Sequence, residues 1–401
     1  LAEEACRGGE GTFCSSVATL SAWALGCGVL SLPKVFVLCG VPWSLAFLLL
    51  FACSAEVALR WIVACGRYSG RRSFRSNAEF FLGPAGGRVV HYGQVALLFF
   101  GIVSVFVLTA ALLPCLARDV LEAMCASDRA VGGGFFGGVC SVRPAQCMPR
   151  EQMMLLVTLV VFPLACRKSL HALRGISALG LCSVAYFSLV LLLRFAGRVA
   201  SGPQEHGGLA AAPATKGGDR SQGSFWQGPP MLLVSFMCHT SILQLDAELR
   251  PDSKQEVGAV IRTVIQRLAL PLYAFVGLGG FAIFGASVSS NVLEDFEGDV
   301  LMSVARLALG LLNMAKIPLG VVTLREDLVR TMPWLPKGPT GRALVTAALL
   351  APAAAVSAFT ASLSSVLSLM GCTVGVLFCL CLPAALYWRL LGRLAPSKGS
   401  L

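Results

Sequence analysis

Two glycines and a proline interrupt the first apolar stretch of the chain at a spacing that could open its backbone to a ligand. Gly26 and Gly28 are followed by Pro33. Both residue types weaken a helix, and a broken helix survives in lipid only where its freed N–H and C=O groups line a polar cavity. Such an unwound segment can hold a zwitterion and cations; here it comprises Gly26, Cys27, Gly28 and Val29. The alternative is a close helix–helix contact through the small glycines.

A second candidate group surrounds His239, near the middle of a later apolar stretch. Imidazole is the side chain whose unperturbed pKa lies nearest neutrality, so His239 could donate a hydrogen bond to a ligand or carry a proton. The hydroxyls of Thr240 and Ser241 follow directly and could join it. The alternative is a packed histidine that bonds a neighbouring carbonyl.

A third group centres on Lys316, about nine residues inside another apolar stretch. A lysine near the bilayer centre costs about 2.5 to 3.5 kcal/mol on insertion scales, so it is expected to face protein or water. Asn313, Lys316 and Gly320 have the i, i+3, i+7 spacing of one helix face. A snorkelling lysine is the alternative.

Two further charged groups are interpreted as structural. Glu56 and Arg60 form an i, i+4 pair on one helix. Arg306 lies about one and a half turns from a helix end, and we expect it to snorkel to the interface.

The cysteine and histidine pattern predicts neither a metal site nor a cofactor. Of the 16 cysteines, most lie in apolar stretches, where cysteine behaves as a small hydrophobic residue. Only Cys125, Cys140 and Cys147 share one connecting loop, where any two of them could form a disulfide in an oxidising compartment. The sequence contains no CxxC pair, no P-loop and no catalytic triad pattern, so we expect a protein that is not an enzyme.

The elements that must carry these groups follow from the composition. Of 401 residues, 56% are hydrophobic and only 13% are charged, about half of the ~25% that is usual for a soluble domain. A helix needs about 20 apolar residues to cross a ~30 Å hydrocarbon core. The pattern predicts an all-α polytopic membrane protein that forms one transmembrane domain over residues 1–401, with ten spans. They are expected at residues 13–37, 42–65, 90–115, 151–167, 174–196, 230–249, 266–288, 301–324, 342–358 and 362–389.

The charge distribution predicts the orientation in the lipid bilayer. One alternate set of loops holds most of the lysines and arginines, and cytoplasmic loops accumulate these residues. The amino terminus is therefore expected in the cytoplasm, with no cleavable signal peptide. The net charge of +11 is spread around the membrane ends and does not line one face, so no nucleic-acid partner is expected.

The motifs resemble those of the amino acid/auxin permease family, which includes sodium-coupled neutral amino acid transporters and vacuolar amino acid transporters. The resemblance runs in order from Gly11 to Leu390. Its motifs are Gly26-Cys27-Gly28-Val29-Leu30-Ser31-Leu32-Pro33 after Ser15-Ser16-Val17, Cys238-His239-Thr240-Ser241-Ile242 with Glu248-Leu249, Ile317-Pro318 with Arg325, and Leu382-Pro383-Ala384-Ala385-Leu386-Tyr387.

This resemblance implies a LeuT-like fold of five spans plus five inverted spans, with helices 1 and 6 discontinuous and the substrate held between them. The family usually has an eleventh helix, which is absent or truncated in this sequence. The resemblance also implies a secondary active transporter that moves amino acids by alternating access. A neutral amino acid is favoured, because no acidic residue lies at mid-membrane depth in the helices of the expected pocket.

The sequence departs from the family at the sodium site. Sodium-coupled members carry an Asn and a hydroxyl where this chain has Ala22 and Lys316. We therefore expect transport without sodium, with Lys316 supplying the positive charge beside Ala22 and Asn313. Proton coupling and exchange both stay open.

Two other functions remain as alternatives: a membrane amino acid sensor or receptor with a cytoplasmic partner, and a facilitative weak-acid carrier or channel. The plasma membrane and a vacuolar or lysosomal membrane are both compatible with the resemblance.

Overall fold

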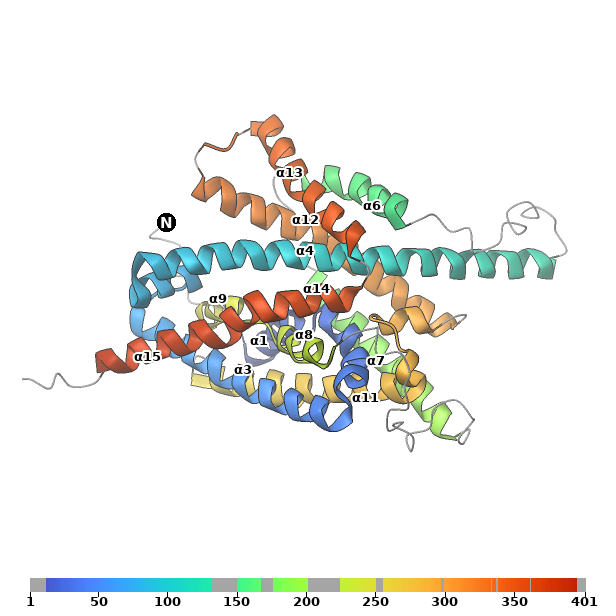
Figure 1. Ribbon diagram of the computed structural model, residues 1–401, viewed down its shortest axis with the longest axis horizontal. Helices are drawn as coiled ribbons and strands as arrows, with labels where there is room; N and C mark the ends of the chain where they lie inside the picture. The colour runs from blue at the N-terminus through green and yellow to red at the C-terminus, as the bar shows by residue number, and fades with distance from the viewer. Residues whose placement is uncertain are drawn as a thin grey trace, which may run out of the picture. The chain divides into compact units, whose positions relative to one another are not determined.

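The part of the chain that the structure describes is helical (Figure 1). The computed structural model describes residues 12–131, 150–166, 176–200, 224–249, 255–296, 299–332, 334–336, 338–360 and 362–394. Cys140 and Cys147 lie outside these residues, and so does the side chain of Cys125, so the disulfide stays a prediction. Cys27 is described by its backbone alone.

The helices confirm a multispan membrane protein. Among the described residues, seven helical segments are long and apolar enough to cross a membrane. They are Val41–Ser69, Phe74–Asp119, Leu179–Ala200, Val257–Ser287, Val300–Val329, Gly338–Phe359 and Leu363–Leu394. A bent pair, Phe13–Ala24 with Gly28–Cys39, would make an eighth span. The two other predicted membrane spans, at residues 151–167 and 230–249, also contain helix. They correspond to α6 (Arg150–Ala165) and to the pair α8 (Gly228–Ser235) and α9 (Ile242–Glu248).

The chain forms two compact units. Unit 1 comprises Leu1–Leu97, Ala211–Phe281 and Leu367–Leu401. Besides α8 and α9, its helices are α1 (Phe13–Ala24), α2 (Leu32–Cys39), α3 (Val41–Ser69), the beginning of α4 (Phe74–Val131), α10 (Val257–Arg262), most of α11 (Leu270–Phe284) and α15 (Leu382–Leu394). A π-helical segment, Thr263–Ala269, connects α10 to α11.

Glycines let the helices of unit 1 approach each other closely. A Cβ atom at Gly277 of α11 would lie only 2.2 Å from the ring of Phe36, which is fully buried in α2. A Cβ atom at Gly371 would lie 2.1 Å from the carbonyl oxygen of Pro230 in α8. Small residues at such contacts are typical of helices that pack in lipid, where association depends on close van der Waals contact. These contacts hold α2 and α8 in place.

Unit 2 comprises Leu98–Ala210 and Ala282–Val366. It contains the rest of α4, α6, α7 (Ile176–Ala200), α12 (Val300–Thr331) and α13 (Gly338–Phe359), while α14 (Leu363–Met370) crosses its boundary. Helix α12 packs against α6, α7 and α13. Arg325 of α12 is buried and donates to the carbonyl of Ala165 at 2.6 Å and to the hydroxyl of Thr346 at 2.8 Å. This arginine of the Ile-Pro motif therefore ties three helices of unit 2 together.

The expectation that Arg306 snorkels is wrong. Its side chain is fully buried and forms an ion pair with Asp119 of α4. It also donates to the carbonyl of Leu293 at 2.9 Å and to the carbonyl of Phe296. Snorkelling assumes that a helix end is open to the interface. Here the turn before α12 covers the guanidinium and supplies its hydrogen-bond acceptors.

We predict that Arg306→Leu strongly destabilises the protein. The change leaves the Asp119 carboxylate buried without its cation, which costs about 3 to 5 kcal/mol. A matched control is Arg194→Leu, because Arg194 pairs with Asp299 at 2.5 Å in the same unit with 45% of its side chain exposed, and exposed pairs contribute only ~0 to 1 kcal/mol. Thermal unfolding of the purified protein measures both effects. Equal shifts in Tm would contradict the structural role of Arg306.

Candidate functional site

The first helix is interrupted where the glycines predicted it. Helix α1 ends at Ala24, and the backbone leaves helical geometry at Leu25 (φ −83°, ψ 70°) and Gly26 (φ −92°, ψ −162°). A short 3-10 turn over Cys27–Ser31 follows, and α2 begins at Leu32. The bend between the two halves is 51°. The interruption frees carbonyls at the end of α1 and N–H groups at the start of the turn.

The two glycines of the break have different surroundings. A Cβ atom at Gly28 would lie 2.6 Å from Oγ of Ser235 in α8, which is closer than real contacts allow, and 3.3 Å from its Cα, which is tight. A Cβ atom at Gly26 would meet no described atom within 4 Å. Gly28 therefore fits the alternative of a close helix contact, whereas Gly26 borders open space that a ligand could enter.

A second interruption follows α8. The helix ends at Ser235, the chain passes through Phe236–Cys238 in irregular geometry, and a 3-10 turn over His239–Ser241 leads into α9. Thr240 and Ser241 are half-buried in this turn. The two motifs that the sequence singled out thus form the same kind of structure, a short helix, a break and a second short helix.

His239 is fully buried in the second break. Neither of its ring nitrogens has a hydrogen-bond partner among the described residues, so the alternative of a packed histidine bonded to a carbonyl is not observed there. Buried polar groups are normally satisfied, and an exception calls for a functional explanation such as a ligand or water. His239 is therefore suited to bind a polar ligand group.

Tyr273 of α11 joins the two breaks. Its buried hydroxyl lies 2.7 Å from the carbonyl of Ala24, where α1 ends, and 2.7 Å from the carbonyl of Ser235, where α8 ends. Sequence reasoning missed this residue. The sequence offers one signal for it: Tyr273 is the single tyrosine of the apolar segment LPLYAFVGLGGFAIF. A tyrosine hydroxyl that is buried in such a segment usually has a hydrogen-bond partner.

These contacts place the ends of α1 and α8 side by side within unit 1. Ser235 packs on Gly28, the hydroxyl of Tyr273 lies within hydrogen-bond distance of both helix ends, and α8 also packs against α2. Helix ends carry partial charges, positive at the amino end and negative at the carboxyl end. Two adjacent breaks can therefore present donors and acceptors together, as the binding of a zwitterion requires.

The residues predicted for the cation site are divided between the units. Ala22 lies half-buried on α1 in unit 1. Asn313 is buried and Lys316 half-buried on α12 in unit 2, shortly before Pro318. A proline inside a helix leaves the carbonyl four residues earlier without its partner. Among the described residues, no group of three His, Cys, Asp or Glu side chains could hold a metal ion.

Adjacent broken helices in a multispan helical protein are typical of transporters with discontinuous helices. The chain belongs to the family described as transmembrane amino acid transporter protein, whose pattern matches residues 9–399. The resemblance that the sequence motifs indicated is thereby confirmed, and members of this family are transporters and not enzymes.

Relatives in fungi, plants and animals resemble the chain over most of its length. Vacuolar amino acid transporter 5 of Schizosaccharomyces pombe is 23% identical over 95% of this chain and 85% of its own length. Amino acid transporter AVT6A of Arabidopsis thaliana is 22% identical over 79% of this chain and 67% of its own length. Human solute carrier family 38 member 8 is 27% identical over 71% of this chain and 61% of its own length.

We predict that Gly28→Ala lowers stability and Gly26→Ala does not. The added methyl at Gly28 must displace Ser235, and overpacking of this kind costs about 1 to 3 kcal/mol. At Gly26 the methyl enters open space. Thermal unfolding of both variants measures the difference, and adding Ser235→Ala to Gly28→Ala should recover part of the loss. Equal stability of the two single variants would contradict the packing assigned to Gly28.

We predict that Tyr273→Phe loosens the junction of the two breaks. The change removes the hydroxyl that the two carbonyls share: the Ala24 carbonyl keeps the N–H of Gly26 at 3.0 Å, whereas the Ser235 carbonyl loses this donor, at a cost of about 1 to 3 kcal/mol. Tyr92→Phe is a matched control, because Tyr92 is 59% exposed. Hydrogen–deuterium exchange should rise in α1 and α8 for Tyr273→Phe alone. Unchanged exchange in both helices would contradict the bridging role.

Proposed function

We propose that the protein is a secondary active transporter that moves amino acids by alternating access. The observation that carries this proposal is the pair of adjacent helix breaks joined by Tyr273. Membership of the transmembrane amino acid transporter family supports the substrate class. The substrate would bind to the open backbone between the breaks, near Gly26 and His239.

In the proposed site, opposite ends of the half-helices take opposite charges of the substrate. Its carboxylate binds N–H groups at the start of the turn that follows Gly26, where the helix dipole is positive. Its ammonium group binds carbonyls at the end of α1 and α8, where the dipole is negative. The imidazole of His239 and the hydroxyls of Thr240 and Ser241 complete this site. A neutral side chain is favoured, because the turns at the two breaks, Cys27–Ser31 and His239–Ser241, contain no acidic residue.

The grouping of helices supports the proposed LeuT-like fold. We number the predicted spans in chain order. The first (α1 and α2) and the sixth (α8 and α9) lie in unit 1, and so do the second (α3) and most of the seventh (α11). The fourth (α6) and the ninth (α13) lie in unit 2. Inverted repeats of five spans relate helices five apart in this way. The fifth and tenth spans do not follow the pattern, since α7 belongs to unit 2 and α15 to unit 1. In alternating access one such group of helices rocks against the other.

We further propose that transport does not use sodium. A cation site needs several oxygen ligands, and this chain has Ala22 and Lys316 at the two family positions that would supply them. The Lys316 ammonium would take the place of the ion, with Asn313 on the same helix face. Coupling to protons or exchange of one amino acid for another then provides the driving force. We propose that the amino terminus lies in the cytoplasm. A vacuolar membrane agrees with the relatives that are vacuolar amino acid transporters.

Uptake by proteoliposomes tests the transport proposal. We expect saturable, accumulative uptake of one or more radiolabelled neutral amino acids from a panel, measured with and without a pH gradient. Binding without uptake would contradict the proposal and favour a sensor. Uptake that neither saturates nor accumulates would favour a facilitative carrier or channel.

We predict equal uptake in sodium and in choline buffer for the wild type at every pH tested. The reason is the missing oxygen ligands at Ala22 and Lys316. The double variant Lys316→Thr with Ala22→Asn restores both, so sodium should stimulate its uptake. Each single variant is the control and should stay insensitive to sodium. Strong sodium stimulation of the wild type would refute the proposed role of Lys316.

A further inference from the structure

Unit 1 has a basic pocket apart from the helix breaks. It has a volume of about 360 Å³ and lies between α3 and the segment that runs from α10 into α11. Its lining residues are Arg60, Gln255, Gly258, Ala259, Arg262, Thr263 and Arg267. Binding pockets for small groups commonly measure 300 to 1,000 Å³, so this pocket can hold a compact ligand.

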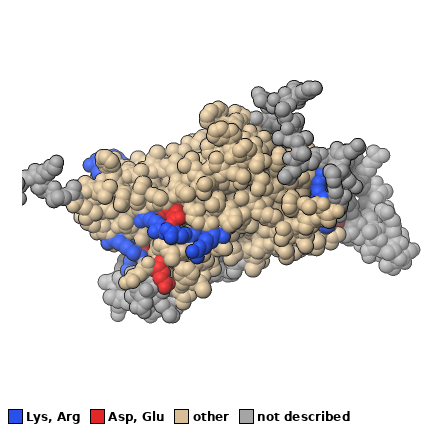
Figure 2. Space-filling model, turned by 90° about the horizontal axis from the view of Figure 1, so that it is seen from below, with Lys and Arg blue, Asp and Glu red and all other residues tan. Residues whose placement is uncertain are grey.

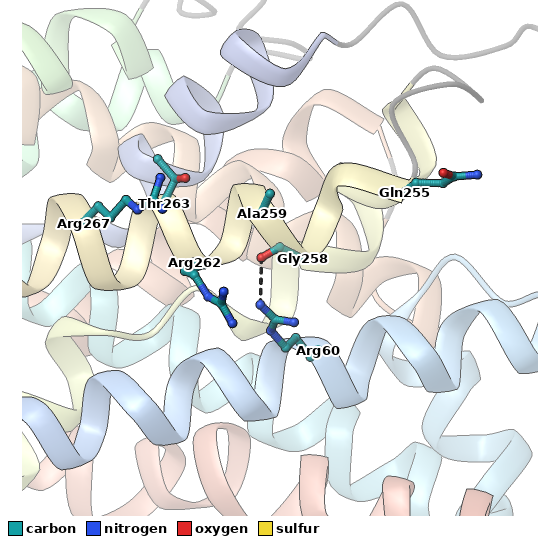
Figure 3. A pocket seen from close by; sticks show the side chains of 7 residues that line it. All are labelled: Arg60, Gln255, Gly258, Ala259, Arg262, Thr263 and Arg267. Carbon is teal, nitrogen blue, oxygen red and sulfur yellow. Dashed lines mark hydrogen bonds between the residues drawn. The ribbon is translucent and has the colours of Figure 1, made fainter.

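Guanidinium groups dominate the pocket. Figure 3 shows Arg60 from α3 and Arg262 from the facing helix pointing toward each other. Arg60 donates to the carbonyl of Gly258 at 3.0 Å and to Oε1 of Glu56 at 2.7 Å, and Nε of Arg262 reaches the same Oε1 at 3.2 Å. Glu56 is thus the carboxylate that holds two of the three arginines in position.

The charges do not balance within the described residues. Glu56 offers one negative charge to Arg60 and Arg262, and Arg267 has no carboxylate partner among the residues that the structure describes. Each guanidinium has five N–H donors, of which these contacts use few. Arginine forks suit phosphate oxygens, which can accept two parallel hydrogen bonds. The chemistry of the pocket therefore fits an anionic phosphate group.

The position of the pocket along the helices indicates where that phosphate comes from. In α3 no charged residue precedes Glu56, and in the facing helix none follows Arg267 before the helix ends at Phe284. The pocket lies where the apolar part of both helices ends, which is the level of lipid headgroups. Figure 2 shows basic side chains gathered on one part of the face that it draws, beside a wide area without charged side chains.

An exposed apolar stripe leads from the pocket along α3. Val57 is 42% exposed, Leu50 is 57% exposed and Cys53 is also exposed. With Arg60 they share one helix face, because they are spaced three or four residues apart. On the facing helix, Leu268 is 42% exposed directly beside Arg267. A soluble phosphate compound would not use this stripe, whereas the acyl chains of a lipid would lie along it.

We propose that this pocket binds the phosphorylated headgroup of an anionic membrane lipid. The guanidinium groups of Arg262 and Arg267 hold the phosphate, Arg60 closes the pocket from α3, and the acyl chains lie over Val57 and Leu50. A bound headgroup links α3 to the start of α11. This site is separate from the proposed transport site and does not depend on transport.

Native mass spectrometry tests this proposal. The whole chain is released from phosphatidylcholine nanodiscs that contain phosphatidylinositol phosphate, and the lipid that stays bound is measured. We compare the wild type with the double variant Arg262→Ala and Arg267→Ala. The control is Arg71→Ala with Arg72→Ala, which removes the same charge from exposed residues outside the pocket. Because only the pocket variant removes guanidinium groups that line the pocket and can hydrogen-bond the phosphate directly, we expect about tenfold less bound lipid for it. The control should lose less than about twofold.

Further measurements separate the outcomes. Arg262→Gln with Arg267→Gln keeps side chains that can form hydrogen bonds, and it should lose lipid as the alanine pair does at an unchanged Tm. Equal losses from pocket and control variants would mean general attraction to charge and would overturn the proposal. In nanodiscs of phosphatidylcholine alone, we also measure the binding of soluble inositol phosphate. If it binds as well as phosphatidylinositol phosphate does, the proposal that the phosphate belongs to a lipid would be overturned.

Discussion

Backbone groups that lose their helical partners inside an apolar protein must find others, and this constraint governs unit 1. Tyr273 supplies a hydroxyl to the ends of both α1 and α8, and Gly28 lets the first break lie directly against Ser235. The tight contacts of Gly277 with α2 and of Gly371 with α8 hold the half-helices in this arrangement. The open side of Gly26 and the ring of His239, which has no hydrogen-bond partner among the described residues, are then available to a ligand.

Charges inside the protein follow the same rule. Arg306 and Arg325 are both buried in unit 2, and each uses its donors on carbonyls of neighbouring elements. The buried arginines act as multiple hydrogen-bond donors that join segments distant in the chain. The arginines of the basic pocket differ, because Arg262 is exposed and shares Glu56 with Arg60.

Features that depend on local sequence could be predicted, and those that depend on distant partners could not. Glycine and proline weaken a helix through their own backbone properties, so the interruption at Gly26 followed from the sequence, as did the i, i+4 pair of Glu56 and Arg60. Tyr273 was not predicted because its partner Ala24 lies 249 residues away. Arg306 was misassigned because an isolated helix does not reveal the turn that covers its end. The cation site stays a prediction for the same reason, since Ala22 and Lys316 belong to different units.

The hydroxyl of Tyr273 carries one proton, yet two carbonyl oxygens lie at equal distance from it. At any instant it can donate to only one of them. If one half-helix withdraws, the hydroxyl turns to the other and keeps its hydrogen bond. Separating the two helix ends therefore leaves one hydrogen bond of the tyrosine in place, and such a bond contributes about 0.5 to 1.5 kcal/mol net. The tyrosine hydroxyl can therefore stay hydrogen-bonded to one helix end when the other end moves away, so it connects the two breaks without fixing the distance between them.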